Sequence, residues 1–299
     1  MSGAMTSGGF LRAAESLAAR ACAMAAQPVQ QQETVPKSAE RGLRVAMLAS
    51  GSKGNAAYIE LDGTRLLIDA GISARRITRS LADLGVDAAS LDGVFITHEH
   101  SDHIKGLPTL LKQYHLPLFA PPATLRAIRE SLAVPEDTFT PLTGNVMLGA
   151  VSVKSFSTLH DAVSPVGYAV CGSEKCALAT DLGFLTNDVM TAIEGADVLV
   201  LEANHDLAAL RRGSYPWPLK QRILSSRGHL SNLDAAWALA RMKRRPAQVF
   251  LAHLSEENNR PELAEETVRD ILGRQGVPLS GLTIALARQR EPVSFGESG

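Results

Sequence analysis

The chain has 299 residues, of which 45% are hydrophobic and 20% are charged. This composition supports a sizeable packed core and excludes general disorder. The formal net charge is −1, so the overall charge does not indicate a nucleic-acid partner. No apolar run approaches the roughly 18 to 20 residues that a membrane-spanning helix needs, and we therefore expect no membrane association.

The cysteines favour a reducing compartment. Cys22, Cys171 and Cys176 are too few and too scattered for a disulfide framework. Cys171 and Cys176 flank a predicted hairpin turn and are expected to be ordinary strand residues. We expect a cytoplasmic protein, and no feature of the sequence indicates an oligomeric state.

The N-terminal segment differs from the rest of the chain. Alanine, serine and glutamine dominate it, and its few acids and several arginines are similar to those of a targeting peptide. It lacks the continuous apolar core of a secretory signal. We expect residues 1–42 to be a disordered extension and residues 43–299 to be a single domain.

The first half of that domain alternates strands with helices. Apolar runs bounded by turn residues predict the strands, and apolar residues at helical spacing predict the helices. In chain order, these elements are strands at 44–49, 56–61 and 65–68, a helix at 74–84, a strand at 94–96, a helix at 102–113, a strand at 117–120 and a helix at 123–132.

The second half begins with successive short strands over residues 145–180, which predicts antiparallel pairing. Ser231, with Asp234 three residues later, is well placed to cap a helix. The later elements are, in chain order, a helix at 187–193, a strand at 198–201, a helix at 232–242, a strand at 248–251, a helix at 262–272 and a strand at 282–287.

Residues 97–103, Thr-His-Glu-His-Ser-Asp-His, directly follow the strand at 94–96. Neutral imidazole and ionised carboxylate are ordinary ligands of divalent ions such as zinc and manganese. His98 and His100 point to the same side of an extended backbone, so the pair can hold one ion while Asp102 and His103 face a second position. A polar surface turn is the alternative, but four potential ligands at this spacing favour a metal site.

The pattern His98-x-His100-x-Asp102-His103 after a buried strand resembles the signature of the metallo-β-lactamase superfamily. This resemblance implies an α/β protein of the metallo-β-lactamase type, an αβ/βα four-layer sandwich of two mixed sheets with helices outside. It also implies a pair of divalent metal ions, zinc or manganese, and further ligands at later strand ends.

Three later residues lie where the superfamily pattern places ligands. These are His160 after a strand at 151–156, Asp181 after a strand at 177–179, and His253 after the strand at 248–251. By resemblance, one ion is held by His98, His100 and His160, and the second by Asp102, His103 and His253. Asp181 bridges the two ions, and Asp102 is also a candidate catalytic residue.

His229 is the second candidate catalytic residue. It lies between a glycine and a helix cap, and a helix N-terminus favours anions. We interpret it as a phosphate contact or a proton donor to the leaving group, with a hydrogen-bonded structural histidine as the alternative. Asp69 either orients a ligand or simply forms a turn. His115 is expected to be structural, and His205 either lines the cleft or is structural.

Basic residues are concentrated in one segment. From Arg211 to Arg245 there are nine basic residues and one acid, an excess of eight, together with Tyr215 and Trp217. Cations for phosphates and aromatic rings for stacking therefore occur together, although the last arginines also suit a helix C-terminus. A Gly-rich turn at 50–55 is a further place for a phosphate. The candidate substrate contacts are Ser52, Asn55, Lys220, Arg227, Ser231 and Asn258.

Within the superfamily, the chain resembles the YycJ (WalJ) branch of exonuclease-like bacterial proteins. The motifs that carry this resemblance are Ser50-Gly51-Ser52-x-Gly54-Asn55, Leu67-Ile68-Asp69-x-Gly71, Tyr215-Pro216-x-x-Leu219-Lys220-x-Arg222-Ile223, Gly228-His229-Leu230-Ser231-Asn232, His253-Leu254-Ser255 and Asn258-Asn259.

The branch implies a metal-dependent phosphodiester hydrolase that acts as a 5′-to-3′ exonuclease, with DNA as its nucleic-acid partner. A dimetal-activated hydroxide is the expected nucleophile. The alternatives are a ribonuclease of the same superfamily and a hydrolase of small thioesters or lactones, which has no need of a basic, aromatic segment. A non-catalytic binding protein is expected to lack ligands, and none is missing here.

Overall fold

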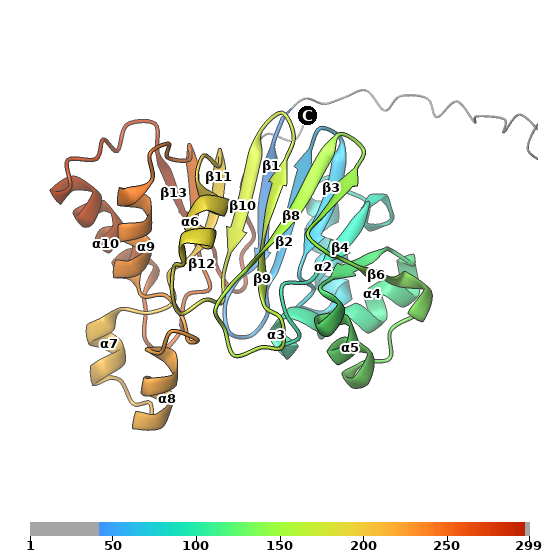
Figure 1. Ribbon diagram of the computed structural model, residues 1–299, viewed down its shortest axis with the longest axis horizontal. Coiled ribbons are helices and arrows are strands. Elements are labelled where there is room, and N and C mark those ends of the chain that lie inside the picture. The colour runs from blue at the N-terminus through green and yellow to red at the C-terminus, as the bar shows by residue number, and fades with distance from the viewer. Residues whose placement is uncertain (1–41, 297–299) are drawn as a thin grey trace, which may run out of the picture. The chain divides into compact units, whose positions relative to one another are not determined.

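The computed structural model describes residues 42–296. Two seven-stranded sheets lie face to face, and helices cover both outer faces (Figure 1). This arrangement confirms the predicted α/β sandwich of four layers. The predicted extension over residues 1–42 lies outside the described residues except for Gly42, so it stays a prediction, as does the single domain.

The first sheet has the order β14-β1-β2-β3-β4-β5-β6. Pairing is antiparallel from β14 to β3 and parallel from β3 to β6, so the sheet is mixed as predicted. Its strands are β1 (Arg44–Ala49), β2 (Ala56–Leu61), β3 (Thr64–Ile68), β4 (Gly93–Phe95), β5 (Leu118–Ala120), β6 (Phe139–Pro141) and β14 (Val293–Phe295).

The second sheet has the order β13-β12-β11-β10-β9-β8-β7 and repeats this layout. Pairing is antiparallel from β7 to β10 and parallel from β10 to β13. Its strands are β7 (Asn145–Leu148), β8 (Val151–Ser157), β9 (Val166–Cys171), β10 (Lys175–Ala179), β11 (Val198–Glu202), β12 (Gln248–Ala252) and β13 (Thr283–Leu286).

The helices lie on the outer faces because alternate strand residues face opposite sides of each sheet. In β1, Val45 and Met47 lie in the core between the sheets, whereas Ala46 and Leu48 pack under the helices of the first sheet. The first sheet is covered by α2 (Ala74–Asp83), α4 (Leu107–Tyr114) and α5 (Pro122–Ser131). The second sheet is covered by α6 (Asn187–Ile193), α9 (Asn232–Arg241) and α10 (Pro261–Arg274).

The structure differs from the predicted helix at 102–113, which is two helices, α3 (Ser101–Ile104) and α4. The break lies at Gly106, whose N–H donates to the Ala70 carbonyl at 2.8 Å. A Cβ at Gly106 would collide with the Ile72 carbonyl, so the chain must pass close to the 70–72 loop. This tertiary contact interrupts the helix.

Two short helices in the basic segment were not predicted. They are α7 (Leu207–Arg212) and α8 (Trp217–Ile223), and Figure 1 shows them apart from the two sheets, below α9 in this view. Each buries only one residue, Leu210 in α7 and Lys220 in α8. Helices with so little buried surface have no apolar periodicity for a sequence pattern to reveal. Two 3₁₀ turns, Ala88–Ser90 and Glu136–Thr138, complete the helical elements.

Within residues 42–296, no helix combines the length and the apolar character that crossing a bilayer requires. The predicted hairpin between β9 and β10 is present, and its Cys171 and Cys176 form no disulfide.

A glycine near the end of β3 allows two loops to meet. The Gly71 N–H donates to the Asn55 carbonyl at 2.7 Å, and a Cβ at Gly71 would collide with the Asp102 carbonyl.

We expect Gly71→Ala to lower the free energy of unfolding by about 1–3 kcal/mol, measured by urea denaturation. Gly273→Ala is the matched control, because a Cβ there meets nothing within 4 Å and a helical alanine adds up to about 1 kcal/mol. Equal loss in both variants would contradict the predicted clash.

Candidate metal centre

Strained turns at strand ends position three of the site carboxylates and imidazoles. Asp69 follows β3, Asp181 lies just beyond β10, and His253 follows β12; their φ angles are 62°, 56° and 56°. Such left-handed conformations cost energy in residues other than glycine and persist where the surroundings fix them. The strand ends therefore aim these side chains at a common point.

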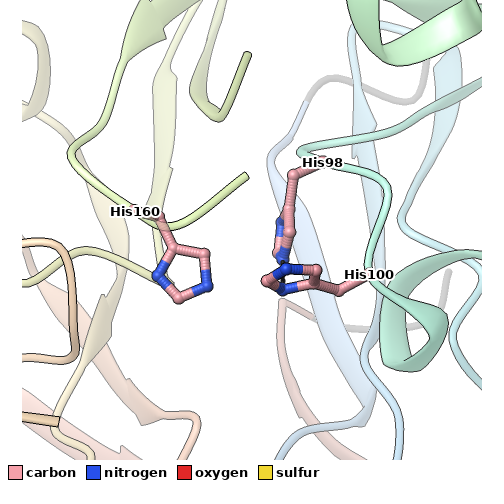
Figure 2. A group of neighbouring side chains, drawn as sticks. All are labelled: His98, His100 and His160. Carbon is pink, nitrogen blue, oxygen red and sulfur yellow. Dashed lines mark hydrogen bonds between the residues drawn. The ribbon is translucent and has the colours of Figure 1, made fainter. Parts of the chain in front are cut away.

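The first group of ligands consists of His98, His100 and His160. His98 and His100 come from the turn after β4 and face His160, which comes from the loop after β8 (Figure 2). His98 Nε2 lies 3.0 Å from His100 Nδ1, and one nitrogen from each of the three rings lies within 4.8 Å of the others. The three histidines predicted to hold one ion are thus brought together.

The second group consists of Asp102, His103 and His253, whose potential ligand atoms also lie within 4.8 Å of one another. Asp102 Oδ2 lies 3.5 Å from His103 Nε2 and 3.9 Å from His253 Nε2. The side-chain amide of Asn55 donates toward His103 Nε2 at 3.1 Å. Asn55, a predicted substrate contact, lies against the ligands of the second group.

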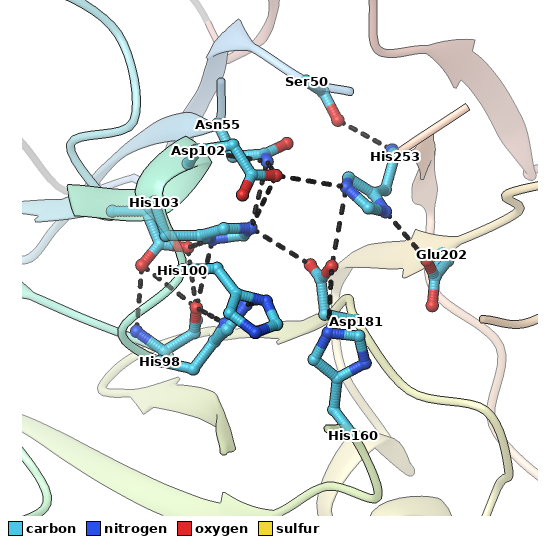
Figure 3. A network of polar contacts seen from close by, with 12 residues as sticks. Ser50, Asn55, His98, His100, Asp102, His103, His160, Asp181, Glu202 and His253 are labelled. Carbon is cyan, nitrogen blue, oxygen red and sulfur yellow. Dashed lines mark hydrogen bonds and ion pairs between the residues drawn. The ribbon is translucent and has the colours of Figure 1, made fainter. Parts of the chain in front are cut away.

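Asp181 lies between the two groups (Figure 3). Its Oδ2 is 3.5 Å from His103 Nε2, and its Oδ1 is 3.5 Å from His253 Nε2 and 4.0 Å from His160 Nε2. Oδ2 thus faces the second group, and Oδ1 lies between His253 of the second group and His160 of the first, a position that suits a bridging ligand. The side chain is buried.

Two buried carboxylates orient the ligands. Asp69, whose role the sequence left open, accepts a hydrogen bond from His103 Nδ1 at 2.8 Å and also bonds Thr97. One residue that the sequence analysis missed is Glu202, which is fully buried and lies 2.9 Å from His253 Nδ1 and 2.8 Å from His229 Nδ1. Such partners fix the ring orientation and leave Nε2 for the metal. Glu202 ends an apolar strand as Asp69 does, and that shared pattern was the available signal.

Two further ligands, His98 and His160, lie against neutral groups through Nδ1. Thr97 Oγ1 lies 3.0 Å from His98 Nδ1, and the Gly228 carbonyl lies 3.2 Å from His160 Nδ1. Burial lowers the pKa of both His98 and His160, so these imidazoles are neutral and suited to act as ligands.

The other half of the site concentrates negative charge. Burial alone would lower the pKa of His103, but the carboxylates of Asp69 and Asp181 raise it to about 10. Burial would likewise lower the pKa of His253, and Asp181, Asp102 and Glu202 raise it instead. Carboxylates that attract protons this strongly also attract a dication, which supplies the same charge compensation.

The polar atoms themselves fit a metal. Among the described residues, Asp181 Oδ2 and His253 Nε2 are buried and form no hydrogen bond, although Asp181 Oδ2 lies 3.5 Å from His103 Nε2 and His253 Nε2 lies 3.5 Å from Asp181 Oδ1. Both atoms point into the space between the two groups of ligands (Figure 3). Buried polar atoms are normally paired, so the donor set is arranged for a cation that binds among these atoms.

A groove of about 180 Å³ adjoins the centre and is lined by Ser52, Tyr215, Arg222 and His229, among others. Arg222 donates to Asp161 Oδ2 through Nε at 2.7 Å, and Asp161 Oδ1 lies 3.2 Å from His160 Nε2. Arg222 and Asp161 were not among the predicted site residues. Arg222 belonged to the basic segment but could not be distinguished there from its neighbours.

Several predicted substrate contacts have other partners. The Lys220 ammonium donates to the carbonyls of Arg211 and Gly213 at 2.9 and 2.6 Å, so it joins α7 to α8. Ser231 forms the predicted capping box with Asp234 at the start of α9. Asn258 is buried, and neither the oxygen nor the nitrogen of its side-chain amide has a hydrogen-bond partner among the described residues. Arg227 is exposed.

The two histidines off the pattern lie apart from the ligands. His205 is buried, burial lowers its pKa to about 4, and its backbone pairs with Ser231. These contacts agree with a structural role. His115 is exposed at the end of α4 and lies 3.7 Å from Asp137.

Comparison with known proteins adds three findings. The model of the β-lactamase superfamily domain matches residues 64–254. The chain is 41% identical to the exodeoxyribonuclease WalJ of Streptococcus pneumoniae over 77% of this chain and 88% of that protein. It is 40% identical to the exodeoxyribonuclease YycJ of Bacillus anthracis over 79% of this chain and 91% of that protein.

Solved structures agree with the fold. The metallo-β-lactamase fold protein YhfI of Bacillus subtilis superposes with a TM-score of 0.63 at 16% identity, over 85% of this chain and 99% of that one. At this identity the similarity concerns the fold alone, and it confirms the metallo-β-lactamase type of sandwich.

The position of Glu202 generates a prediction about metal affinity. Glu202→Gln removes the negative charge that orients His253 and leaves the shape of the side chain. We expect zinc affinity to fall about 10- to 100-fold, measured by competition with a chromophoric chelator. Glu266→Gln, on the exposed face of α10, is the matched control. Equal zinc affinity in the two variants would exclude this orienting role.

Proposed function

The chain belongs to the metallo-β-lactamase superfamily and, within it, to the WalJ and YycJ branch, and from this premise we propose that it is a metal-dependent 5′-to-3′ DNA exonuclease. The observation that carries the proposal is the set of seven potential metal ligands, in which six side chains surround Asp181. This set accompanies about 40% identity to two exodeoxyribonucleases over most of the chain.

The proposed cofactor is a pair of divalent ions, zinc or manganese. His98, His100 and His160 would hold one ion, Asp102, His103 and His253 the other, and Asp181 would bridge them. When bound, two dications lower the pKa of a shared water and offset the charge of an attacked phosphodiester. Asp69 and Glu202 keep the ligand rings in place through the hydrogen bonds described above.

His229 is the proposed proton donor to the leaving oxygen, or a contact to the phosphate. Its Nδ1 is engaged by Glu202 at 2.8 Å, which leaves Nε2 for the substrate. The ring lines the groove beside the metal ligands. A group in this position can protonate a leaving oxygen on the side away from the buried carboxylates.

The basic segment, which supplies Tyr215 and Arg222 to the groove, favours a polyanionic substrate. Residues 211–227 contain five basic residues and no acid, and the side chain of Arg222 is 60% exposed where it lines the groove. A nucleic-acid backbone neutralises such cations and releases its counterions. These basic residues favour a nucleic-acid substrate over a small thioester or lactone. The cytoplasmic location stays a prediction from the cysteines.

The function is tested by digestion of end-labelled duplex DNA, single-stranded DNA and RNA with manganese, zinc or a chelator. We expect metal-dependent shortening of DNA from its 5′ end. Asp181→Ala should lower the rate by more than about 100-fold, because loss of a residue that merely orients a ligand already costs about 10- to 100-fold. Asp270→Ala, at an exposed position of α10, is the control and should digest DNA normally.

The other outcomes would contradict the proposal in different ways. Preferential digestion of RNA would make the protein a ribonuclease of the same superfamily. Intact metal binding without cleavage of any nucleic acid would favour the hydrolysis of small thioesters or lactones.

The next prediction concerns two basic residues of α8, Arg222 and Lys220. Arg222→Gln removes an exposed charge at the groove, so the dependence of DNA affinity on salt should weaken by about one unit in the log–log slope. Lys220→Met removes a buried charge and should leave that slope unchanged. It should lower the free energy of unfolding by about 1–3 kcal/mol, because two carbonyls lose their donor.

Fluorescence anisotropy over a range of salt concentrations measures the slope, and urea denaturation measures stability. A reduced slope in the Lys220 variant, or an unchanged slope in the Arg222 variant, would contradict these assignments.

A further inference from the structure

An aromatic side chain is exposed beside the metal centre. Phe184 is 57% exposed and follows Asp181 by three residues, so their Cα atoms lie at most about 11 Å apart. The intervening Gly183 N–H donates to the Leu159 carbonyl at 3.0 Å, which ties this loop to the one that carries His160. A single exposed apolar ring is common on protein surfaces, so the significance of Phe184 depends on the groove that it lines.

Phe184 forms one wall of a groove of about 300 Å³ between α6 and α9. Both helices lie on the outer face of the second sheet (Figure 1). Trp237 also lines this groove, and the guanidinium of Arg241 lies 5.7 Å from the centre of the Trp237 ring. Asn187, Met190 and Asp234 also line this α6–α9 groove.

The chemistry of the α6–α9 groove suits a flat heterocycle with polar edges. Phe184 and Trp237 offer ring faces for stacking, and the Arg241 guanidinium adds a planar cation. The amide of Asn187 offers a hydrogen-bond donor and an acceptor, as the edges of a nucleobase require. The volume of the α6–α9 groove lies at the lower end of the range for small-molecule sites. This volume is enough for one base and too little for a duplex.

We propose that the α6–α9 groove binds an unpaired base of the nucleic-acid strand whose phosphodiester lies at the metal centre. This inference rests on the proposed function and specifies its substrate class: strands with unpaired bases near the cleaved end. A paired base cannot enter, because its faces are stacked and its edge is bonded to the other strand. Duplex ends must therefore separate locally before a base occupies the groove.

The test measures binding to the full-length protein loaded with manganese, by fluorescence anisotropy. One probe is a 5′-phosphorylated oligothymidylate whose first linkages are phosphorothioates that resist cleavage. The second has the same backbone without bases in its first positions. We expect Phe184→Ala to weaken binding of the first probe about tenfold and to leave the second unchanged.

Conservative variants distinguish stacking from a structural effect. Phe184→Tyr keeps the ring and should bind as the wild type does, whereas Phe184→Leu keeps apolar surface without the ring and should bind weakly. Met147→Ala is the matched control, because Met147 is 58% exposed on the edge strand β7. We expect no change in this variant.

The outcomes separate this inference from the proposed function. Equal binding of both probes by the wild type, or an equal loss for both probes in Phe184→Ala, would overturn the base-binding groove even if DNA digestion is normal. Base-dependent binding that requires Phe184, without digestion of any nucleic acid, would support the groove and overturn the nuclease.

Discussion

The arrangement of this site depends on two buried carboxylates that hold imidazole rings in place. Asp69 follows β3 of the first sheet and orients His103, and Glu202 ends β11 of the second sheet and orients His253 and His229. Buried carboxylates are costly unless they are paired. The histidine rings therefore supply hydrogen-bond partners to the carboxylates, and the carboxylates in turn orient the rings. A bound dication would balance the remaining negative charge.

The metal centre also connects the two sheets. His103 comes from the first sheet and His253 from the second, and both approach the Asp181 carboxylate at 3.5 Å. The backbone N–H of His253 donates to Ser50 Oγ, just beyond β1, at 2.7 Å. Polar contacts where the ligands meet thus join the two sheets, in addition to the apolar core between them. This explains how the left-handed turns at Asp181 and His253 are maintained: the facing sheet restrains the side chains that they present.

The features that could be predicted from the sequence are those that depend on local periodicity and on position at a strand end. Most strands, the helices with an apolar face and the turn of four ligands follow from spacing alone, because a buried strand must end where its apolar run ends. Glu202 was missed since a single acid after a strand has no distinguishing spacing. Its role arises from two histidines that are 27 and 51 residues away in the chain. The break at Gly106 was missed for the same reason, as its cause is a contact with the 70–72 loop.

Charge patterning was the least informative signal, and α8 shows why. Lys220 and Arg222 are two residues apart in a helix and therefore face in different directions. Lys220 is 8% exposed and donates to two carbonyls, whereas the Arg222 side chain is 60% exposed at the groove. A count of basic residues treats them alike. The direction of each side chain depends on where α7 packs, and α7 buries only Leu210, so apolar spacing does not predict its position. The part of the chain that is proposed to contact substrate is thus the part whose structure hydrophobic patterning specifies least.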